Sequence, residues 1–174
     1  MKKLLRTLPG AVLTALAISG CAALGIAPPF DATGVYRGTW TGTVQGATNA
    51  DRSCSVTFDL KQADSSSFLQ GFALTGEATI YFSCSSMLDD IAENGLPARV
   101  SLGVKGFLLP DGSIAFASIE PGTTQSILIT VSGAGLDNDS DGIMDQIKAD
   151  WTLIIDQPNH PRITVVGKVD AGTS

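Results

Sequence analysis

The sequence predicts an all-β fold in which about eight strands follow one another as a single antiparallel meander. Apolar and polar residues alternate along most of the chain from residue 34 onward, and this period of two is typical of strands with one buried face. Turn-forming residues separate the alternating stretches at short intervals. Helices have little support, since only residues 87–93 allow one or two helical turns, which Asn94-Gly95-Leu96-Pro97 would end.

The first three strands are predicted at residues 34–44, 54–61 and 68–82. In residues 54–61 the apolar side chains occupy the even positions and the polar ones the odd positions without a break. Residues 68–82 continue the pattern, with an apolar face of Phe72, Leu74, Ala78, Ile80 and Phe82 and a polar face of Thr75, Glu77 and Thr79. Each strand therefore offers one face to a core and one to water.

A hairpin is predicted in the middle of the chain. Residues 100–108 place Val100, Leu102, Val104 and Leu108 on one face. Pro110-Asp111-Gly112 supplies residues that reverse a chain, and residues 114–116 begin the returning strand with Ile114 and Phe116.

Three more strands are predicted at residues 125–133, 144–156 and 162–169. In the second of these the inward positions are Ile147, Ala149, Trp151, Leu153 and Ile155. Residues 126–131 carry apolar side chains on both faces, which predicts an extra apolar surface in need of cover. Consecutive strands with short turns favour a closed or nearly closed barrel, because closure removes the exposed edges; a two-sheet sandwich is the alternative.

Residues 1–20 have the three parts of a secretory signal. Lys2, Lys3 and Arg6 form a positive start, and an uncharged apolar run over residues 8–18 is too short for a membrane span, which needs about 20 residues. The signal ends at Ile18-Ser19-Gly20-Cys21, which resembles the lipobox of bacterial lipoproteins. An ordinary cleaved signal is the alternative, but it would leave Cys21 as an unpaired thiol in an oxidising compartment.

The lipoprotein resemblance implies that Cys21 is acylated, becomes the new N-terminus and anchors the exported chain to the bacterial envelope. Because Ala22 rather than aspartate follows the cysteine, the resemblance also implies the outer membrane rather than the inner one. Residues 21–31 then form the lipidated N-terminus and a short, proline-bearing tether that spans at most about 35 Å. Residues 32–174 form a single barrel-like domain.

The charge of the exported part limits its partners. The signal holds three of the 11 basic residues and none of the 17 acidic ones, which leaves 8 against 17 and a net charge of −9. Such a surface repels phosphate backbones, so no nucleic acid partner is expected, while cations are more plausible ligands.

Cysteine usage agrees with export. Once Cys21 carries lipid, Cys54 and Cys84 remain as an even pair in a compartment where disulfides persist, and we expect them to be bonded. The chain has no Cys-x-x-Cys motif, so a structural zinc site or redox centre has no support.

The predicted first strand reads Gly34-Val35-Tyr36-Arg37-Gly38-Thr39-Trp40-Thr41-Gly42. Over these few residues it resembles the opening strand of the lipocalin and avidin group of small barrels, which implies that Gly38 and Trp40 close the barrel floor. The glycines at every fourth position share a face with Trp40, which suits a strongly coiled strand or one packed under a large ring. An ordinary core position for Trp40 is the alternative.

One acidic segment has the pattern of a metal site. In Asp137-Asn138-Asp139-Ser140-Asp141-Gly142-Ile143-Met144-Asp145, carboxylates recur at every second position and glycine is the sixth residue. The segment resembles the calcium loops of the EF-hand, dockerin and thrombospondin type 3 families. That resemblance implies that Asp137, Asp139, Asp141 and Asp145 bind Ca²⁺ through side chains and Ile143 through its carbonyl.

The acidic segment departs from the EF-hand calcium loop in two ways. Lys148 stands where the EF-hand has its bidentate glutamate, and the flanking residues are predicted strands rather than helices. The role implied for Ca²⁺ is therefore structural, as a clamp on a hairpin. A solvated acidic turn is the alternative, since Asp, Asn and Gly are favoured in turns.

Catalytic motifs have no support, and no catalytic residue is assigned. Gly-x-Ser-x-Gly, His-Glu-x-x-His and phosphate-loop patterns do not occur, and the single histidine, His160, lies between prolines. The favoured role is a barrel that binds a small apolar ligand or a lipid in its mouth. The alternative is an interaction lipoprotein that docks an envelope protein and has no ligand cavity. A cavity above about 300 Å³ would separate the two roles.

Overall fold

The computed structural model describes residues 27–45, 51–67, 71–84, 97–118, 126–156 and 162–173. In these residues all regular secondary structure is β: β1 (Gly34–Gln45), β2 (Asp51–Ser67), β3 (Gly71–Tyr81), β4 (Arg99–Leu108), β5 (Ser113–Ser118), β6 (Ser126–Leu136), β7 (Gln146–Asp156) and β8 (Ile163–Thr173). The predicted secretory signal with Cys21, the weak helical pattern at residues 87–93 and His160 lie outside the described residues. Within that part of the chain, no helix is long and apolar enough to cross a membrane.

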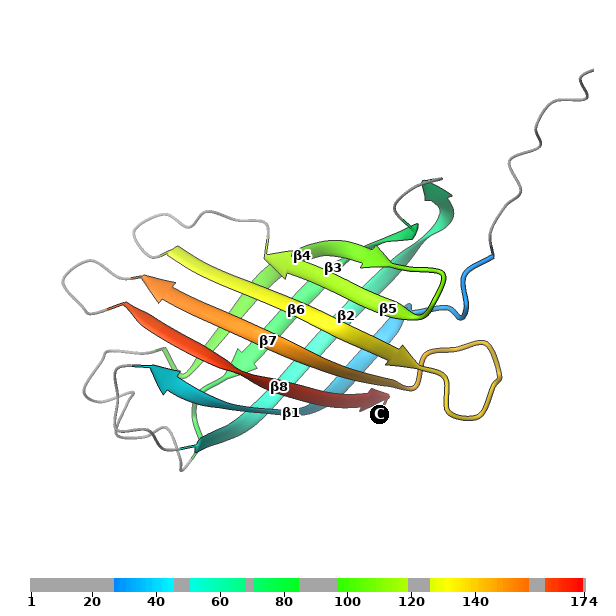
Figure 1. The fold of residues 1–174 in the computed structure, drawn as a ribbon. Coiled ribbons are helices and arrows are strands. Elements are labelled where there is room, and N and C mark those ends of the chain that lie inside the picture. The colour runs from blue at the N-terminus through cyan, green and yellow to red at the C-terminus, as the bar shows by residue number, and fades with distance from the viewer. Residues whose placement is uncertain are drawn as a thin grey trace, which may run out of the picture.

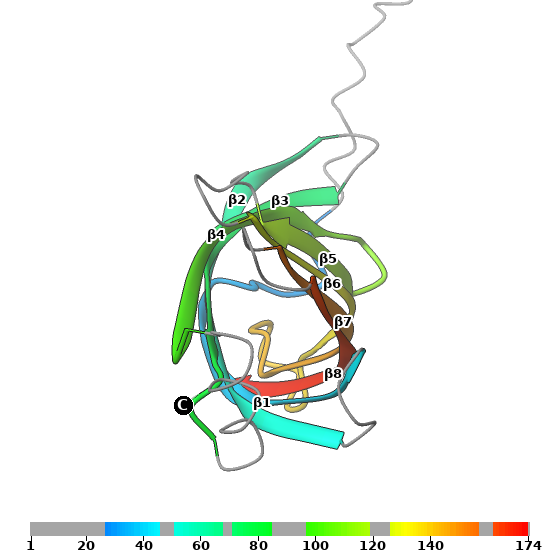
Figure 2. The ribbon, with the colours of Figure 1, turned by 90° about the vertical axis from the view of Figure 1, so that its left-hand side faces the viewer.

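The strands form one closed antiparallel barrel. Each strand pairs with the next, and β1 also pairs with β8, where residues 36–45 run against residues 164–173 (Figures 1 and 2). The predicted all-β meander closed into a barrel is therefore confirmed, and the two-sheet sandwich is wrong. The predicted hairpin after β4 is also confirmed, since Gly112 has a φ of 83° and the Ser113 backbone N–H donates to the Asp111 carboxylate at 2.9 Å. This hydrogen bond lowers the pKa of Asp111.

Alternation along each strand sends apolar side chains into the barrel. The largest fully buried ones are Trp40, Trp151, Tyr36, Phe58, Phe82, Leu60, Leu74, Ile80, Leu108, Ile114 and Ile129. Rings from opposite walls meet inside, since the ring centroids of Phe58 on β2 and Phe116 on β5 lie 5.2 Å apart. An eight-stranded barrel is just wide enough for side chains to fill it, so these rings take up much of the available width.

Inward-facing glycines let the backbones of β1 and β8 approach closely. A side chain at Gly38 would collide with the backbone carbonyl of Asp170, and one at Gly167 would collide with that of Thr41. Glycines on β1 therefore allow the close strand approach that their spacing predicts for a strongly coiled strand. Trp40 packs above this region, at mid-length of its strand.

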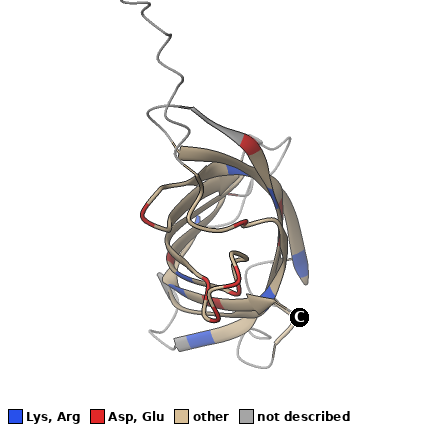
Figure 3. Cartoon of the chain, turned by 90° about the vertical axis from the view of Figure 1, so that its right-hand side faces the viewer, with Lys and Arg blue, Asp and Glu red and all other residues tan. Residues whose placement is uncertain are grey.

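The two ends of the barrel differ in character. One end carries the disulfide between Cys54 and Cys84, whose Cα atoms lie 5.6 Å apart, and this confirms the predicted bond. The other end carries the acidic residues 137–145 between β6 and β7, together with the start of the described chain. Figure 3 looks onto this second end and shows the acidic residues along its loop.

Candidate functional site

The N-terminal segment docks against the acidic loop before β1 begins. Asp31 forms an isolated parallel bridge with Ile143. The Asp31 backbone N–H donates to the Gly142 carbonyl at 2.8 Å, and the Met144 N–H donates to the Asp31 carbonyl at 2.9 Å. Phe30 is buried, with only 7% of its surface exposed. Phe30 and Asp31, which the sequence pattern assigned to the tether, thus pack on the barrel end.

Carboxylates in the loop accept hydrogen bonds from the loop's own backbone. The two oxygens of Asp137 accept from the N–H groups of Asp141 at 3.2 Å and Gly142 at 2.9 Å. Asp145 accepts from the Asn138 N–H at 2.6 Å, which links the two ends of the loop. These contacts curl the backbone so that the acidic side chains converge.

Two residues of the loop have left-handed backbone conformations. Gly142 has a φ of 86°, which glycine adopts without strain. Ser140 has a φ of 62°, an uncommon value for a residue with a side chain. The glycine at the sixth position therefore has a conformational reason as well as a place in the calcium pattern.

Three of the predicted ligands converge on one point. Carboxylate oxygens of Asp137, Asp139 and Asp145 lie within 4.8 Å of one another. Asp141 is outside this set, and its carboxylate instead accepts the Ile143 N–H at 2.8 Å. Ile143, the predicted carbonyl ligand, has 48% of its surface exposed. A cluster of carboxylate oxygens of this kind is the donor set that hard cations such as Ca²⁺ prefer.

The neighbouring carboxylates affect the pKa of Asp139. The hydrogen bond from the Asp141 N–H lowers its pKa. Desolvation and the charges of Asp141, Asp145 and Asp137 act in the opposite direction and outweigh that bond, so the pKa of Asp139 is raised above its ordinary value. A bound cation would relieve this repulsion.

A buried tyrosine hydroxyl lies near the same end of the barrel. Tyr36 is fully buried, and its hydroxyl has no hydrogen-bond partner among the described residues. Its neighbours in register are Phe58 and Thr173. Burial, and then the charges of Asp31 and Asp145, raise the pKa of Tyr36. Sequence reasoning missed this residue, because alternation shows that it faces inward but not that a partner is lacking.

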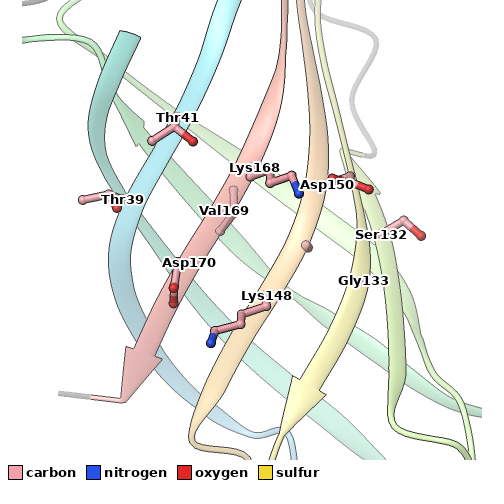
Figure 4. A pocket seen from close by; sticks show the side chains of 10 residues that line it. Thr39, Thr41, Ser132, Gly133, Lys148, Asp150, Lys168, Val169 and Asp170 are labelled. Carbon is pink, nitrogen blue, oxygen red and sulfur yellow. The ribbon is translucent and has the colours of Figure 1, made fainter. Parts of the chain in front are cut away.

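A second candidate region lies on the outside of the barrel. Outward side chains of β1, β6, β7 and β8 line a hollow of about 450 Å³, which Figure 4 shows from close by. Its polar lining consists of Thr39, Thr41, Ser132, Lys148, Asp150, Lys168 and Asp170. Hollows of about 370 Å³ and 330 Å³ adjoin it and share Gly167 with each other. This part of the outer wall is thus recessed and polar.

Apolar side chains border the recessed wall. Leu128 on β6 and Val166 on β8 are 42% and 45% exposed, respectively. Ile154 on β7 is half-buried and stands opposite Leu128 in register. Leu128 belongs to the stretch of residues 126–131 for which the sequence predicts apolar side chains on both faces, and it lies on the outer one.

The predicted residues therefore fall into separate places. Cys21 lies outside the described residues, Cys54 and Cys84 are bonded at one end, and the acidic loop lies at the other. Gly38 and Trp40, the floor residues implied by the lipocalin and avidin resemblance, lie at mid-length of β1. Comparisons with protein-family models, with curated proteins and with solved structures found no match for this chain.

Proposed function

We propose that this protein is a lipid-anchored envelope protein whose barrel is an interaction module, with a protein partner bound to its outer wall. The main support is that side chains pack the interior of the barrel, whereas free space lies on its outer surface. Aromatic rings meet across the interior, whereas the 450 Å³ hollow opens on the outer surface. Exposed Val166 lines the two smaller hollows, and exposed Leu128 lies further along β6; both add apolar area that a partner would bury.

A small-ligand or lipid-binding role has less support. A barrel of that kind keeps a largely apolar space of about 300 Å³ or more inside, lined by a few polar groups. In this chain Trp40 packs on both Trp151 and Phe82 in the interior. The recessed outer wall is polar and open, which suits a protein surface better than a small apolar molecule.

Acylation of Cys21 would hold the module near a membrane. Residues 22–29 separate that cysteine from the docked Phe30, and an extended stretch of this length spans at most about 28 Å. The barrel end with the acidic loop would then be the end nearest the bilayer. Metabolic labelling with a palmitate analogue tests the anchor: the wild-type chain takes up label, and the Cys21→Ser variant does not.

The acidic loop supports a second proposal, in which it binds a structural Ca²⁺. Asp137, Asp139 and Asp145 would supply side-chain oxygens, and water or backbone carbonyls would complete the six to eight ligands that Ca²⁺ takes. The convergence of three carboxylates within 4.8 Å favours this interpretation over a simple solvated turn. Because the backbone of Asp31 is hydrogen-bonded to Gly142 and Met144 of this loop, the ion would stiffen the entry of the tether.

Photo-crosslinking in living cells tests the interaction role. A photo-reactive amino acid is placed at Thr130, which is exposed on the outer wall of β6, and at the exposed Thr75 of β3 as the control. We expect a protein adduct from position 130 and none from position 75. No adduct from position 130 or from other positions of the recessed wall would overturn the interaction role.

A further inference from the structure

We propose that the partner on the outer wall is a second copy of this chain, related to the first by a two-fold axis that runs along the strands between β7 and β8. This inference rests on the proposed interaction role and names the partner. It starts from four exposed charged residues at the hollow: Lys148 and Asp150 on β7, and Lys168 and Asp170 on β8.

These four residues, called the charged square below, alternate in sign. Lys148 is opposite Asp170 in register, and Asp150 is opposite Lys168. Along each strand a lysine and an aspartate stand two residues apart on the outer face. In Figure 4, Lys148 extends from β7 toward β8 and Lys168 from β8 toward β7. Neighbouring corners of the square are therefore opposite in charge, and diagonal corners are alike.

A square of this kind is complementary to itself in only some orientations. Rotation about an axis that runs between β7 and β8 exchanges the two strands at each level. Lys148 then faces Asp170 of the second copy, and Asp150 faces Lys168 of the second copy. An axis along a diagonal would instead place lysine on lysine and aspartate on aspartate, which costs free energy. The charges thus select the register of docking.

The shape of the wall fits the same axis. Strands of such barrels tilt by about 35–45° from the barrel axis, so rotation about the strand direction crosses the two barrels at roughly 70–90°. A barrel wall is convex around its circumference, and the 450 Å³ hollow shows that this wall is also recessed. At such a crossing the convex circumference of each copy runs across that of the other, and the hollow leaves room for the side chains that meet there.

Apolar contacts add to the charges. Val166 lies one outward position beyond the charged square on β8, and the same rotation places it against Thr152 of the second copy. Burial of apolar surface contributes about 25 cal/mol per Å². Anchoring both copies in one membrane would raise their effective concentration, so contacts of modest strength suffice for association.

Charge reversal on the full-length chain tests this arrangement. Two differently tagged copies are expressed in the same cells, solubilised in mild detergent and purified through one tag. Wild-type copies should be recovered together. The Asp150→Lys variant sets a new lysine against Lys168 of the second copy, and the Lys168→Asp variant sets a new aspartate against Asp150 of the second copy. Recovery of the second tag should therefore fall about tenfold or more for either variant.

Mixing the two variants is the decisive step. An Asp150→Lys copy offers two lysines to the two aspartates of a Lys168→Asp copy, so this pair should be recovered together at about the wild-type level. Lys105→Asp, a reversal of an exposed lysine on the opposite wall, is the matched control and should change nothing. Thermal melts of each variant verify that the barrel stays folded.

The remaining outcomes separate the two proposals. Photo-adducts from position 130 to a different protein, with no recovery of a second copy, would overturn the self-association and leave the interaction role standing. Absence of both adducts and co-recovery would overturn both. Unchanged recovery of Asp150→Lys and Lys168→Asp copies would exclude this wall, and failure of their mixture to associate would exclude the proposed axis.

Discussion

Trp40 and Trp151 pack against each other with ring centroids 4.9 Å apart and ring planes at 50°, although their strands β1 and β7 are separated by β8. Gly167 of β8 is opposite Trp151 on one side and Gly42 on the other, so this position of β8 places no side chain beside the Trp151 ring. Each indole N–H is satisfied: Trp40 donates to the Tyr81 carbonyl at 3.2 Å, and Trp151 donates to the Thr41 carbonyl at 3.4 Å.

Replacing Gly167 by alanine should disturb this packing. The added Cβ would meet the Thr41 carbonyl, a backbone atom that cannot move without shifting β1. We expect a loss of about 1–3 kcal/mol in the free energy of unfolding and a change in the near-ultraviolet circular dichroism of the tryptophans. Thr75→Ala, on the exposed face of β3, is the control. Equal denaturation midpoints for Gly167→Ala and the wild-type chain would contradict the expected close approach.

Replacing Tyr36 by phenylalanine should stabilise the barrel. The change removes a buried hydroxyl without a partner among the described residues, and we expect a gain of about 1 kcal/mol at pH 7 in chemical denaturation. Because the pKa of Tyr36 is raised in the fold, its neutral form is favoured there. The proton equilibrium of Tyr36 therefore does not change the free energy of unfolding below its ordinary pKa of 10.0. Above that pH the unfolded chain releases the proton first, and the folded state loses stability.

The loss of stability at alkaline pH distinguishes Tyr36 from other titratable groups. Tyr36→Phe should lose less stability than the wild-type chain between pH 9 and about pH 11, and Tyr81→Phe serves as the matched variant. Equal losses for Tyr36→Phe and the wild-type chain would show that Tyr36 does not contribute to the alkaline transition.

Removing the disulfide should cost stability at the end opposite the acidic loop. Cys54 and Cys84 close a loop with a sequence separation of 30 residues, and the chain-entropy relation gives about 3–4 kcal/mol for a loop of that length. Chemical denaturation of the Cys54→Ser, Cys84→Ser double variant should show this loss, and a reducing agent should affect the wild-type chain alone. An unchanged midpoint would mean that the bond does not constrain the unfolded chain.

Calcium should raise the melting temperature if the loop binds it. At a concentration about 100 times the dissociation constant, binding adds roughly 2.7 kcal/mol, which corresponds to about 5–10 °C for a domain of this size. Thermal melts with Ca²⁺ and with a chelator measure the shift. Asp139→Asn should reduce it, whereas Asp111→Asn, in the neighbouring hairpin, should not. Identical melts in the two conditions would leave only an acidic turn.

Local alternation was enough to predict the strands and their inward faces. The residues expected inward on β7, from Ile147 to Ile155, are buried, as are Phe72, Leu74 and Ile80 on β3. The expected start of the second strand at Cys54 was late and its expected end at Lys61 was early. The structure extends β2 over Asp51–Ser67, with a register shift between Gln62 and Ser66 that interrupts simple alternation.

Contacts between distant segments could not be predicted in the same way. Pairing of β1 with β8 joins the two ends of the barrel domain, and alternation carries no signal for it. Docking of Phe30 and Asp31 on the acidic loop depends on tertiary packing alone. Within the loop, spacing identified the carboxylates, but the backbone decides that Asp137, Asp139 and Asp145 converge while Asp141 caps the Ile143 N–H.

The docked N-terminal segment also has a mechanical consequence. With the proposed anchor, any pull on the tether reaches the barrel first through the two backbone hydrogen bonds between Asp31 and residues 142 and 144, and through buried Phe30. These few contacts carry the load before the long ladder between β1 and β2 does. We therefore expect this junction to break under tension before the closed wall of the barrel does.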